Sequence, residues 1–320
     1  MNCIEICAGG GGQAIGLEEA GFQAQALVEI DPHACATLRL NRPLWRVIEG
    51  DVKVFDAAAY TGIDLIAGGV PCPPFSVAGK QLGADDERDL FPEALRLVEE
   101  ARPQAVLLEN VRGLLDPGFT TYRENLCLQL AKLGYTSDIR VIHASDYGVS
   151  QLRPRAIIVA VKKYLSEYFE WPICRSSVPK TVGNLLYDLI SANGWSRVHQ
   201  WREQANTIAP TIVGGSKKHG GPDLGPTRAK RAWLQLGVDG HGIADEAPPI
   251  DFEGLPRLTT RMVARIQGFP DDWIFSGKKT AAYRQIGNAF PPPAAKAVAE
   301  QIAMCIRLGN RVFSSIEVAA

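Results

Sequence analysis

A cysteine flanked by prolines follows a short apolar run in the first quarter of the chain. The run Asp64–Ala67 leads into Gly-Gly-Val-Pro-Cys-Pro-Pro over residues 68–74, so Cys72 sits in a loop that prolines stiffen. If the run is a strand of an open α/β sheet, Cys72 lies at its carboxyl end, where such sheets bind ligands. A thiolate there could act as a nucleophile, given a positive charge or a proton acceptor nearby. A buried cysteine that only packs is the alternative.

Three charged residues are expected near the same edge. Glu109 ends the apolar run 105–108, and a carboxylate there is costly unless it is hydrogen-bonded or functional. Arg153 and Arg155 stand two positions apart before the run 156–161, so both side chains can point to one face. Acid–base or charge-stabilising chemistry beside Cys72 would need such groups. For the arginines, a surface phosphate site or an ion-pair site is the alternative.

A glycine-rich turn follows the first apolar run. Residues 8–14 read Ala-Gly-Gly-Gly-Gly-Gln-Ala, and Glu29 lies 20 positions after Gly9. Glycines let the backbone approach a ligand closely, and an acidic residue at this distance suits ribose hydroxyls. Asp51 adds a carboxylate suited to an adenine amino group, although such residues more often cap turns. The pattern favours a nucleotide-like cofactor and leaves three options open: a nicotinamide dinucleotide, S-adenosylmethionine, or a turn without ligand.

The order of apolar runs and helical patterns predicts the elements that position these residues. Strand-like runs at 3–7, 26–30, 64–67, 105–108 and 156–161 alternate with helical patterns at 13–20, 34–40, 91–101 and 123–133. This alternation predicts a parallel, doubly wound, Rossmann-like α/β sheet. Between 171 and 256 the rhythm fails and Gly and Pro clusters appear, which predicts a second, smaller, loop-rich domain. Helices are predicted over 261–267 and from the prolines 291–293 to 308.

Composition and charge exclude several classes of protein. The 320 residues are 46% hydrophobic and 22% charged, with no apolar run of 18 residues and no signal-peptide pattern, so a cytoplasmic protein without a membrane segment is expected. Seven cysteines without a paired C-x-x-C argue against disulfides or a bound metal. Residues 1–150 carry 12 Lys and Arg against 21 Asp and Glu, whereas residues 151–320 carry 22 against 14. The basic second half suggests a polyanion partner, with solvated charge as the alternative.

Six segments, taken in order, resemble the motif set of the DNA cytosine-5 methyltransferases. They are residues 9–12, Pro71-Cys72, Glu109-Asn110-Val111, Gln151-x-Arg153-x-Arg155, the stretch 261–270, and Gln285-Ile286-Gly287-Asn288-Ala289. The resemblance spans nearly the whole chain. It implies a Rossmann-like, S-adenosylmethionine-dependent methyltransferase sheet, formed by residues 1–175 and 284–320, with the last helix packed back on it. Residues 176–283 would form the smaller, loop-rich target-recognition domain and hinge.

The reaction of this family implies a role for each matched residue. Cys72 would add to C6 of a cytosine that is flipped out of duplex DNA, so that C5 can take the methyl group of S-adenosylmethionine. Glu109 would hold or protonate N3 of the base. Arg153 would contact the base carbonyl or help organise the thiolate, with Arg155 supporting it. Cys7 departs from the family, which usually has Phe there. The implied cofactor contacts are Cys7, Ala8, Gly9, Gly10, Gly11, Gly12, Glu29, Ile30, Asp51, Val52, Pro71, Leu90 and Asn288.

Contacts to duplex DNA are expected from the catalytic loop and from the basic insert. Residues 197–231 carry 7 Lys and Arg against Glu203 and Asp223. The stretch Thr207–Gly215 resembles the Thr-containing element of recognition domains, and a hairpin edge without a DNA role is the alternative. The expected contacts to phosphates or base edges are Ser76, Lys80, Gln81, Thr211, Lys217, Lys218, Arg228, Lys230 and Arg231.

The interpretation that the sequence favours is a modification methyltransferase of the bacterial or phage type. It would act as a monomer on nucleoid DNA and protect that DNA from a restriction endonuclease that acts on the same site. A tRNA substrate is a second interpretation, and a catalytically silent homologue that binds DNA or cofactor is a third. A nicotinamide oxidoreductase is a distant fourth, because the Pro71-Cys72 loop has no role in hydride transfer. The recognition sequence itself is not predicted.

Overall fold

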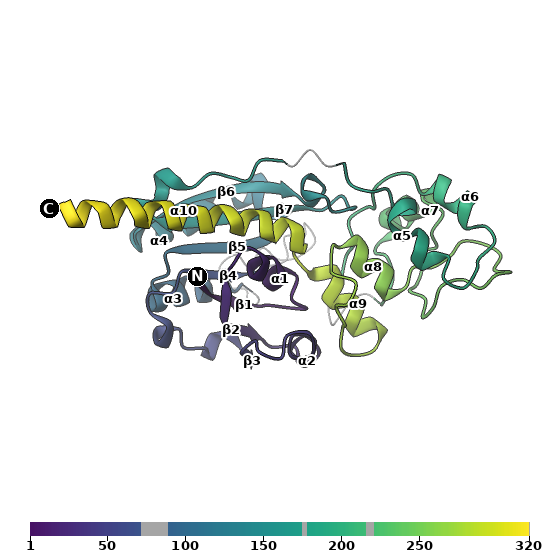
Figure 1. Cartoon of the computed structure of the whole chain (residues 1–320), viewed down its shortest axis with the longest axis horizontal. Coiled ribbons are helices and arrows are strands. Elements are labelled where there is room, and N and C mark those ends of the chain that lie inside the picture. The colour runs from purple at the N-terminus through teal and green to yellow at the C-terminus, as the bar shows by residue number, and fades with distance from the viewer. Residues whose placement is uncertain (72–88, 175–177, 216–220, 320) are drawn as a thin grey trace.

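The computed structural model describes residues 1–71, 89–174, 178–215 and 221–319. The strands in this part of the chain form one seven-stranded sheet in the order β3-β2-β1-β4-β5-β7-β6. Figure 1 shows an elongated molecule, with the sheet and its covering helices in one half and the helices α5 to α9 in the other. The strands are β1 (Asn2–Ile6), β2 (Gln23–Glu29), β3 (Val47–Glu49), β4 (Leu65–Gly68), β5 (Ala105–Val111), β6 (Tyr135–His143) and β7 (Pro154–Lys162).

Strands β1 to β5 are parallel, as the alternation of runs predicts, but β7 is antiparallel to both β5 and β6. The prediction of an all-parallel sheet is therefore wrong at this strand. Only residues 144–153 separate β6 from β7, and a parallel pair needs a crossover of about a dozen residues or more. Because β7 runs backwards, its first residues lie at the edge where β5 ends, and Arg155 is the register partner of Val111.

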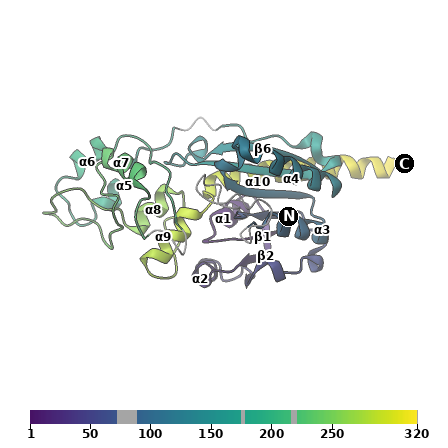
Figure 2. The same ribbon diagram turned by 180° about the vertical axis from the view of Figure 1, so that it is seen from behind.

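Helices cover both faces of the sheet (Figures 1 and 2). Leu97 of α3 and Leu130 of α4 are buried on the face of Ile4 and Val106, and Leu17 of α1 and Ile302 of α10 are buried on the opposite face. The bounds are α1 (Gly12–Glu19), α2 (Pro32–Asn41), α3 (Phe91–Ala101), α4 (Thr120–Lys132) and α10 (Pro292–Ala319). The doubly wound fold is thus confirmed.

Among the described helices, none is long and apolar enough to cross a membrane.

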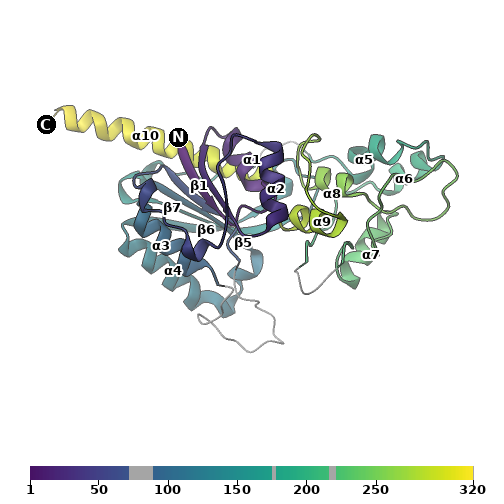
Figure 3. The same cartoon turned by 90° about the horizontal axis from the view of Figure 1, so that it is seen from below.

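The last helix packs on the first, as the family resemblance implies. A Cβ atom at Gly16 would lie only 2.6 Å from Ala295 Cβ and 2.6 Å from the backbone nitrogen of Lys296. Glycine at this position therefore lets α1 and α10 approach almost backbone to backbone. The contact ties residues near both ends of the described chain to one face of the sheet (Figure 3).

The other half of the molecule consists of short helices and long connections. The helices are α5 (Val182–Ile190), α6 (Val198–Gln204), α7 (Thr227–Gln235), α8 (Thr260–Ile266) and α9 (Lys279–Asn288). Their buried residues, Trp201 and Trp233 among them, join a core that also includes Leu38 of α2 and Trp273. Trp273 Nε1 donates to the carbonyl oxygen of Gly10 at 3.0 Å, so the two halves are in contact at the glycine-rich turn. The boundaries proposed at residues 176 and 283 remain predictions.

The remaining helical turns are short 3₁₀ segments that begin or connect the main elements. They are η1 (Val52–Val54), η2 (Ala58–Tyr60), η4 (Arg112–Leu115), η5 (Pro117–Phe119), η6 (Ala144–Tyr147) and η7 (Lys163–Tyr168). The last of these supports α10, because a Cβ atom at Gly309 would lie 2.2 Å from Leu165 Cδ2.

Candidate functional site

A cavity opens at the carboxyl ends of the parallel strands, between the sheet and α9. Its position is the one that open α/β sheets use for ligands. The side chains and backbone that line it come from β1, the glycine-rich turn, β2, β5 and α9. The lining residues are Glu5, Cys7, Ala8, Gly9, Gly10, Gly12, Gln13, Glu29, Asp31, Ala34, Gly69, Glu109, Arg284, Gln285, Asn288, Ala289 and Phe290.

The glycine-rich turn forms one wall of this cavity because side chains would not fit there. A Cβ atom at Gly10 would lie 3.0 Å from Gln285 Cβ, and one at Gly12 would lie 2.4 Å from the carbonyl oxygen of Phe290. Gly11 adopts a φ of 91°, and its Cβ position faces Trp273 rather than the cavity. Cys7 adopts a φ of 52°, which is uncommon for a residue other than glycine. Backbone atoms, rather than side chains, therefore form much of this wall.

Glu29 holds the turn in place. Its Oε2 accepts from the backbone N–H of Gly9 at 2.7 Å, while Oε1 accepts from Ile30 at 2.9 Å and Asp31 at 2.7 Å. Asp51, in contrast, accepts from the N–H of Lys53 at 3.0 Å and caps η1, which is the commoner role for such a residue. Six expected cofactor contacts are not among the residues that line the cavity: Gly11, Ile30, Asp51, Val52, Pro71 and Leu90.

Two polar residues that the sequence analysis missed face the cavity from buried positions. The Glu5 side chain is 1% exposed, and its Oε2 atom has no hydrogen-bond partner. Burial raises the pKa of Glu5 well above its ordinary value, and the charge of Glu29 adds to the effect. Neither polar atom of the Gln13 amide has a partner. The sequence did contain a signal for Glu5, because a carboxylate inside the apolar run 3–7 is costly unless it is hydrogen-bonded or functional, as was argued for Glu109.

Glu109 and Arg155 form a buried ion pair at the cavity. Arg155 Nε lies 2.6 Å from Glu109 Oε1, and the two side chains are 12% and 10% exposed. The antiparallel course of β7 creates this pair, because it brings the start of β7 beside the end of β5. Glu109 Oε2 lies 3.4 Å from the position that a Cβ at Gly69 would occupy, so glycine gives the carboxylate room.

The backbone that leads to Cys72 is held beside Glu109. Asn110 Nδ2 donates to the carbonyl oxygen of Val70 at 2.9 Å, and the N–H of Leu90 donates to the carbonyl oxygen of Pro71 at 3.3 Å. Cys72 itself, together with Ser76, Lys80 and Gln81, lies outside the described residues. The described part of the chain therefore brings Glu109 and Asn110 beside Gly69 and Val70, a few residues before the expected nucleophile.

Arg153 makes its contacts with backbone carbonyl oxygens. Its side chain is fully buried and donates to the carbonyl oxygens of Ile212 at 2.7 Å, Gly287 at 2.8 Å and Ala289 at 2.8 Å. Burial lowers the pKa of Arg153 well below its ordinary value, and the charge of Arg155 adds to the effect. Arg155 is the arginine that pairs with Glu109. The expected contact of Arg153 with the base carbonyl or the thiolate stays a prediction, because Cys72 lies outside the described residues.

Arg153 belongs to a buried polar cluster that joins the two halves of the molecule. Gln151 Nε2 donates to Gln267 Oε1 at 2.5 Å, and Gln151 Oε1 accepts from the N–H of Ile212 at 2.8 Å. Thr211, an expected DNA contact, donates its hydroxyl to the carbonyl oxygen of Leu152 instead. Asn288 also lies at this junction, and its Nδ2 donates to the carbonyl oxygen of Gly215 at 3.3 Å.

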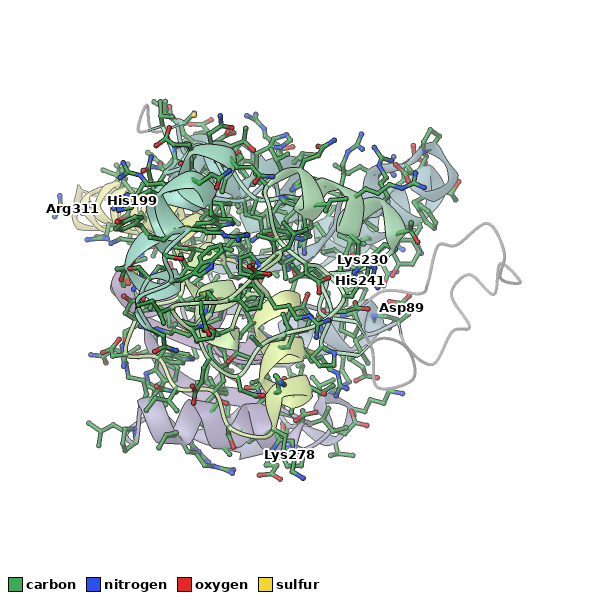
Figure 4. The ribbon with its side chains drawn as sticks, turned by 90° about the vertical axis from the view of Figure 1, so that its right-hand side faces the viewer. Asp89, His199, Lys230, His241, Lys278 and Arg311 are labelled. Atoms are coloured by element: carbon green, nitrogen blue, oxygen red, sulfur yellow. The ribbon has the colours of Figure 1, made fainter. Side chains whose placement is uncertain are left out.

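Besides Thr211, the expected DNA contacts in the insert that the structure describes lie on α7. Arg228 and Arg231 are exposed, while Lys230 is half-buried and forms a 2.8 Å ion pair with Asp223. Lys217 and Lys218 lie outside the described residues. In Figure 4, Lys230 lies beside His241 and on the same side of the molecule as Asp89, which begins the described chain after the catalytic loop.

The whole chain is similar to proteins that modify DNA. The model of the family "C-5 cytosine-specific DNA methylase" matches residues 1–304. The Type II methyltransferase M.NgoMIV of Neisseria gonorrhoeae is 58% identical over 310 residues, which cover 96% of this chain and 98% of that protein. M.NaeI of Lentzea aerocolonigenes is 55% identical over 314 residues, which cover 96% of this chain and 76% of that protein. A crystal structure of an E. coli prophage DNA modification methyltransferase matches with a TM-score of 0.67 at 26% identity, covering 96% and 99% of the two chains.

Proposed function

The chain belongs to the C-5 cytosine-specific DNA methylase family, and on this premise we propose that it methylates C5 of a cytosine in duplex DNA as the modification enzyme of a Type II restriction–modification system. The structural observation that supports the proposal best is the buried Glu109–Arg155 pair. It lies at a cavity that the glycine-rich turn lines, next to the backbone that leads to Cys72.

We propose S-adenosylmethionine as the methyl donor, and the lining of the cavity suits it. When bound, it supplies a methyl group on a positively charged sulfur. Glu29 offers carboxylate oxygens for ribose hydroxyls, beside backbone that has no side chains to exclude the nucleoside. Glu5 is a buried carboxylate that lacks a partner at Oε2, and it suits the α-ammonium group of the methionine end. Gln13 offers an unpaired amide to the same end.

The residues around the base would act together on the cytosine ring. The Cys72 thiolate adds to C6, and the electrons of the C5–C6 double bond make C5 able to attack the methyl carbon. The bond from that carbon to sulfur breaks, its electrons stay on sulfur, and S-adenosylhomocysteine leaves. A base such as water then takes the C5 proton, and the electrons of the C5–H bond restore the double bond and expel the thiolate from C6. Glu109 holds the N3 and N4 edge of the base, while Arg155 keeps the carboxylate in place and adds positive charge where charge develops on the ring.

The biological setting is the remaining part of the proposal. A restriction endonuclease that cuts the same sequence would accompany the enzyme, since the relatives carry the name of Type II methyltransferases. The enzyme would act as a monomer on nucleoid DNA in the cytoplasm. Its modification of the site protects that DNA from the endonuclease.

Methyl incorporation from tritiated S-adenosylmethionine tests the proposal. Purified protein is incubated with unmethylated duplex DNA or with total tRNA, and the nucleic acid is digested to identify the labelled base. Label in 5-methylcytosine of DNA alone is the expected result. Label in tRNA would make tRNA the substrate. An absence of label from protein that binds the cofactor in a calorimeter would leave a silent DNA-binding homologue and refute the proposal.

A further inference from the structure

A second cavity lies between α7 and the loop that follows it, away from the cofactor cavity. It has a volume of about 460 Å³. Thr227, Lys230 and Arg231 of α7 form one wall, and Asp239, Gly240 and His241 form the other. Two of its cations, Lys230 and Arg231, were expected to contact DNA.

The two walls are held together by close packing. A Cβ atom at Gly240 would lie 3.3 Å from Lys230 Cγ, so glycine lets the loop lie against α7. The N–H of Leu224 donates to the carbonyl oxygen of Gly240 at 3.0 Å. Under the helix, Trp233 is fully buried in the core. The cavity is thus formed by fixed elements before any ligand binds, which lowers the entropy cost of recognition.

Asp239 fixes the orientation of His241. Its Oδ1 accepts from the backbone N–H of His241 at 3.0 Å and faces His241 Nδ1 at 2.8 Å, while Oδ2 accepts from Arg257 Nε at 2.7 Å. Although burial acts to raise it, these hydrogen bonds lower the pKa of Asp239 to about 2. An ionised carboxylate can only accept, so the proton of the neutral ring sits on Nδ1. In the neutral form of this imidazole, which is 71% exposed, Nε2 is then the nitrogen left as an acceptor.

The cavity is lined by the donors of Lys230 and Arg231 and by the acceptor of His241, besides the carboxylate of Asp239 and the hydroxyl of Thr227. Arg231 is exposed and has no ion-pair partner among the described residues, and Lys230 keeps two N–H donors beyond the one that faces Asp223. In the major groove, guanine presents the acceptors N7 and O6, and the paired cytosine presents the N4 donor. If thymine took the place of cytosine, its O4 acceptor would face His241 Nε2, which is also an acceptor, and its methyl group would enter the cavity.

We propose that this cavity reads the major-groove edge of one G·C base pair in the recognition sequence, with Arg231 and Lys230 donating to guanine and His241 Nε2 accepting from cytosine N4. The proposal rests on the proposed function, because it takes duplex DNA as the substrate. In the view of Figure 4, Lys230 and His241 lie on the same side of the molecule as Asp89.

The test compares His241→Ala and Arg231→Ala with the wild type on a library of random-sequence duplexes. Bound duplexes are selected and sequenced, and methylated positions are mapped in parallel. Both variants are expected to lower the preference for G·C over the other base pairs at the same position of the consensus, by about 10- to 100-fold. The control variants His199→Ala and Lys278→Ala remove an exposed imidazole and an exposed ammonium that lie away from the cavity, and they should keep the wild-type consensus.

Chemical substitution of the base separates base reading from phosphate contact. Replacing guanine at the relaxed position by 7-deazaguanine removes the N7 acceptor, and wild-type binding should fall about tenfold while binding by Arg231→Ala changes little. An unchanged consensus in both variants, or a uniform loss over all sequences, would overturn the proposal. If the wild type selects a consensus without methylating it, the proposed function fails, and the selected sequences still decide whether the cavity reads a base pair.

Discussion

Replacing Arg153 by methionine should damage the fold before it damages the chemistry. The side chain is fully buried and donates to three carbonyl oxygens, two of which belong to the end of α9 and the residue after it. Helix ends leave carbonyls without partners, and the residues four positions after Gly287 and Ala289 are Pro291 and Pro293, which have no N–H. Arg153 therefore caps α9 and ties it to β7 and to the segment around Ile212.

The magnitude follows from the bonds that are lost. Each of the three buried carbonyls that loses its donor costs about 1 kcal/mol or more. Methionine carries no charge and so avoids the desolvation cost of the buried guanidinium, but this gain offsets only part of the loss. We expect a loss of about 3–5 kcal/mol in the free energy of unfolding. For a chain of this size that corresponds to a fall in Tm of about 6–10 °C. The hinge between the two halves would loosen with it.

Thermal melts beside methyl-transfer rates separate this role from a contact with the base. Arg155→Lys is the matched variant, since it keeps the charge next to Glu109 and should melt within about 2 °C of the wild type while its methyl-transfer rate falls at least about tenfold. If Arg153→Met instead melted like the wild type and lost only its methyl-transfer rate, Arg153 would contact the base. The structural role assigned to it would then be wrong.

The further predictions concern packing, pH, cofactor binding and thiol reactivity. Gly16→Ala should lower the Tm by several degrees in a thermal melt, because its Cβ would clash with α10, whereas Gly118→Ala, with open space around it, should change the Tm little. Glu5 binds its proton more tightly in the folded than in the unfolded protein, so its ionisation lowers the free energy of unfolding increasingly as pH rises above about 4.5. Without cofactor, Glu5→Gln should therefore have a higher Tm than the wild type at pH 8, and the difference should be smaller at pH 5. The same variant should lose at least about tenfold in calorimetric affinity for S-adenosylhomocysteine but not for 5′-methylthioadenosine, which lacks the ammonium group. Burial raises the pKa of Cys7 to about 12, so iodoacetamide at pH 7.5 should label the exposed Cys174 and leave Cys7 unmodified in peptide maps.

Local patterns predicted the elements of the sheet well. The helical pattern at 91–101 coincides with α3, and each predicted strand overlaps an observed one. The pattern could not show the direction of β7, because direction depends on the length of the connection from β6, and β6 itself was not predicted. Its alternation of exposed and buried residues is that of an edge strand, and its sequence has no continuous apolar run.

The roles of individual charged residues depended on tertiary contacts that spacing cannot reveal. The period of two predicted that Arg153 and Arg155 can point to one face, but which of them pairs with Glu109 follows from the course of β7 beside β5. Glu29 was expected at the cavity and lines it, whereas Asp51 only caps a turn. The acceptor role of His241 was beyond prediction, because it arises from Asp239 and Arg257, which lie 18 positions apart.

Covalent trapping on modified DNA tests the central claim most directly. A duplex in which 5-fluorocytosine replaces cytosine lets the thiolate add to C6 and the methyl group transfer, but the fluorine at C5 cannot leave as a proton does. With S-adenosylmethionine, wild type and Cys174→Ser should form a protein–DNA complex that survives denaturing electrophoresis, and Cys72→Ser should form none. Trapping that persists in Cys72→Ser, or that fails in the wild type while 5-methylcytosine still forms on ordinary DNA, would contradict Cys72 as the nucleophile.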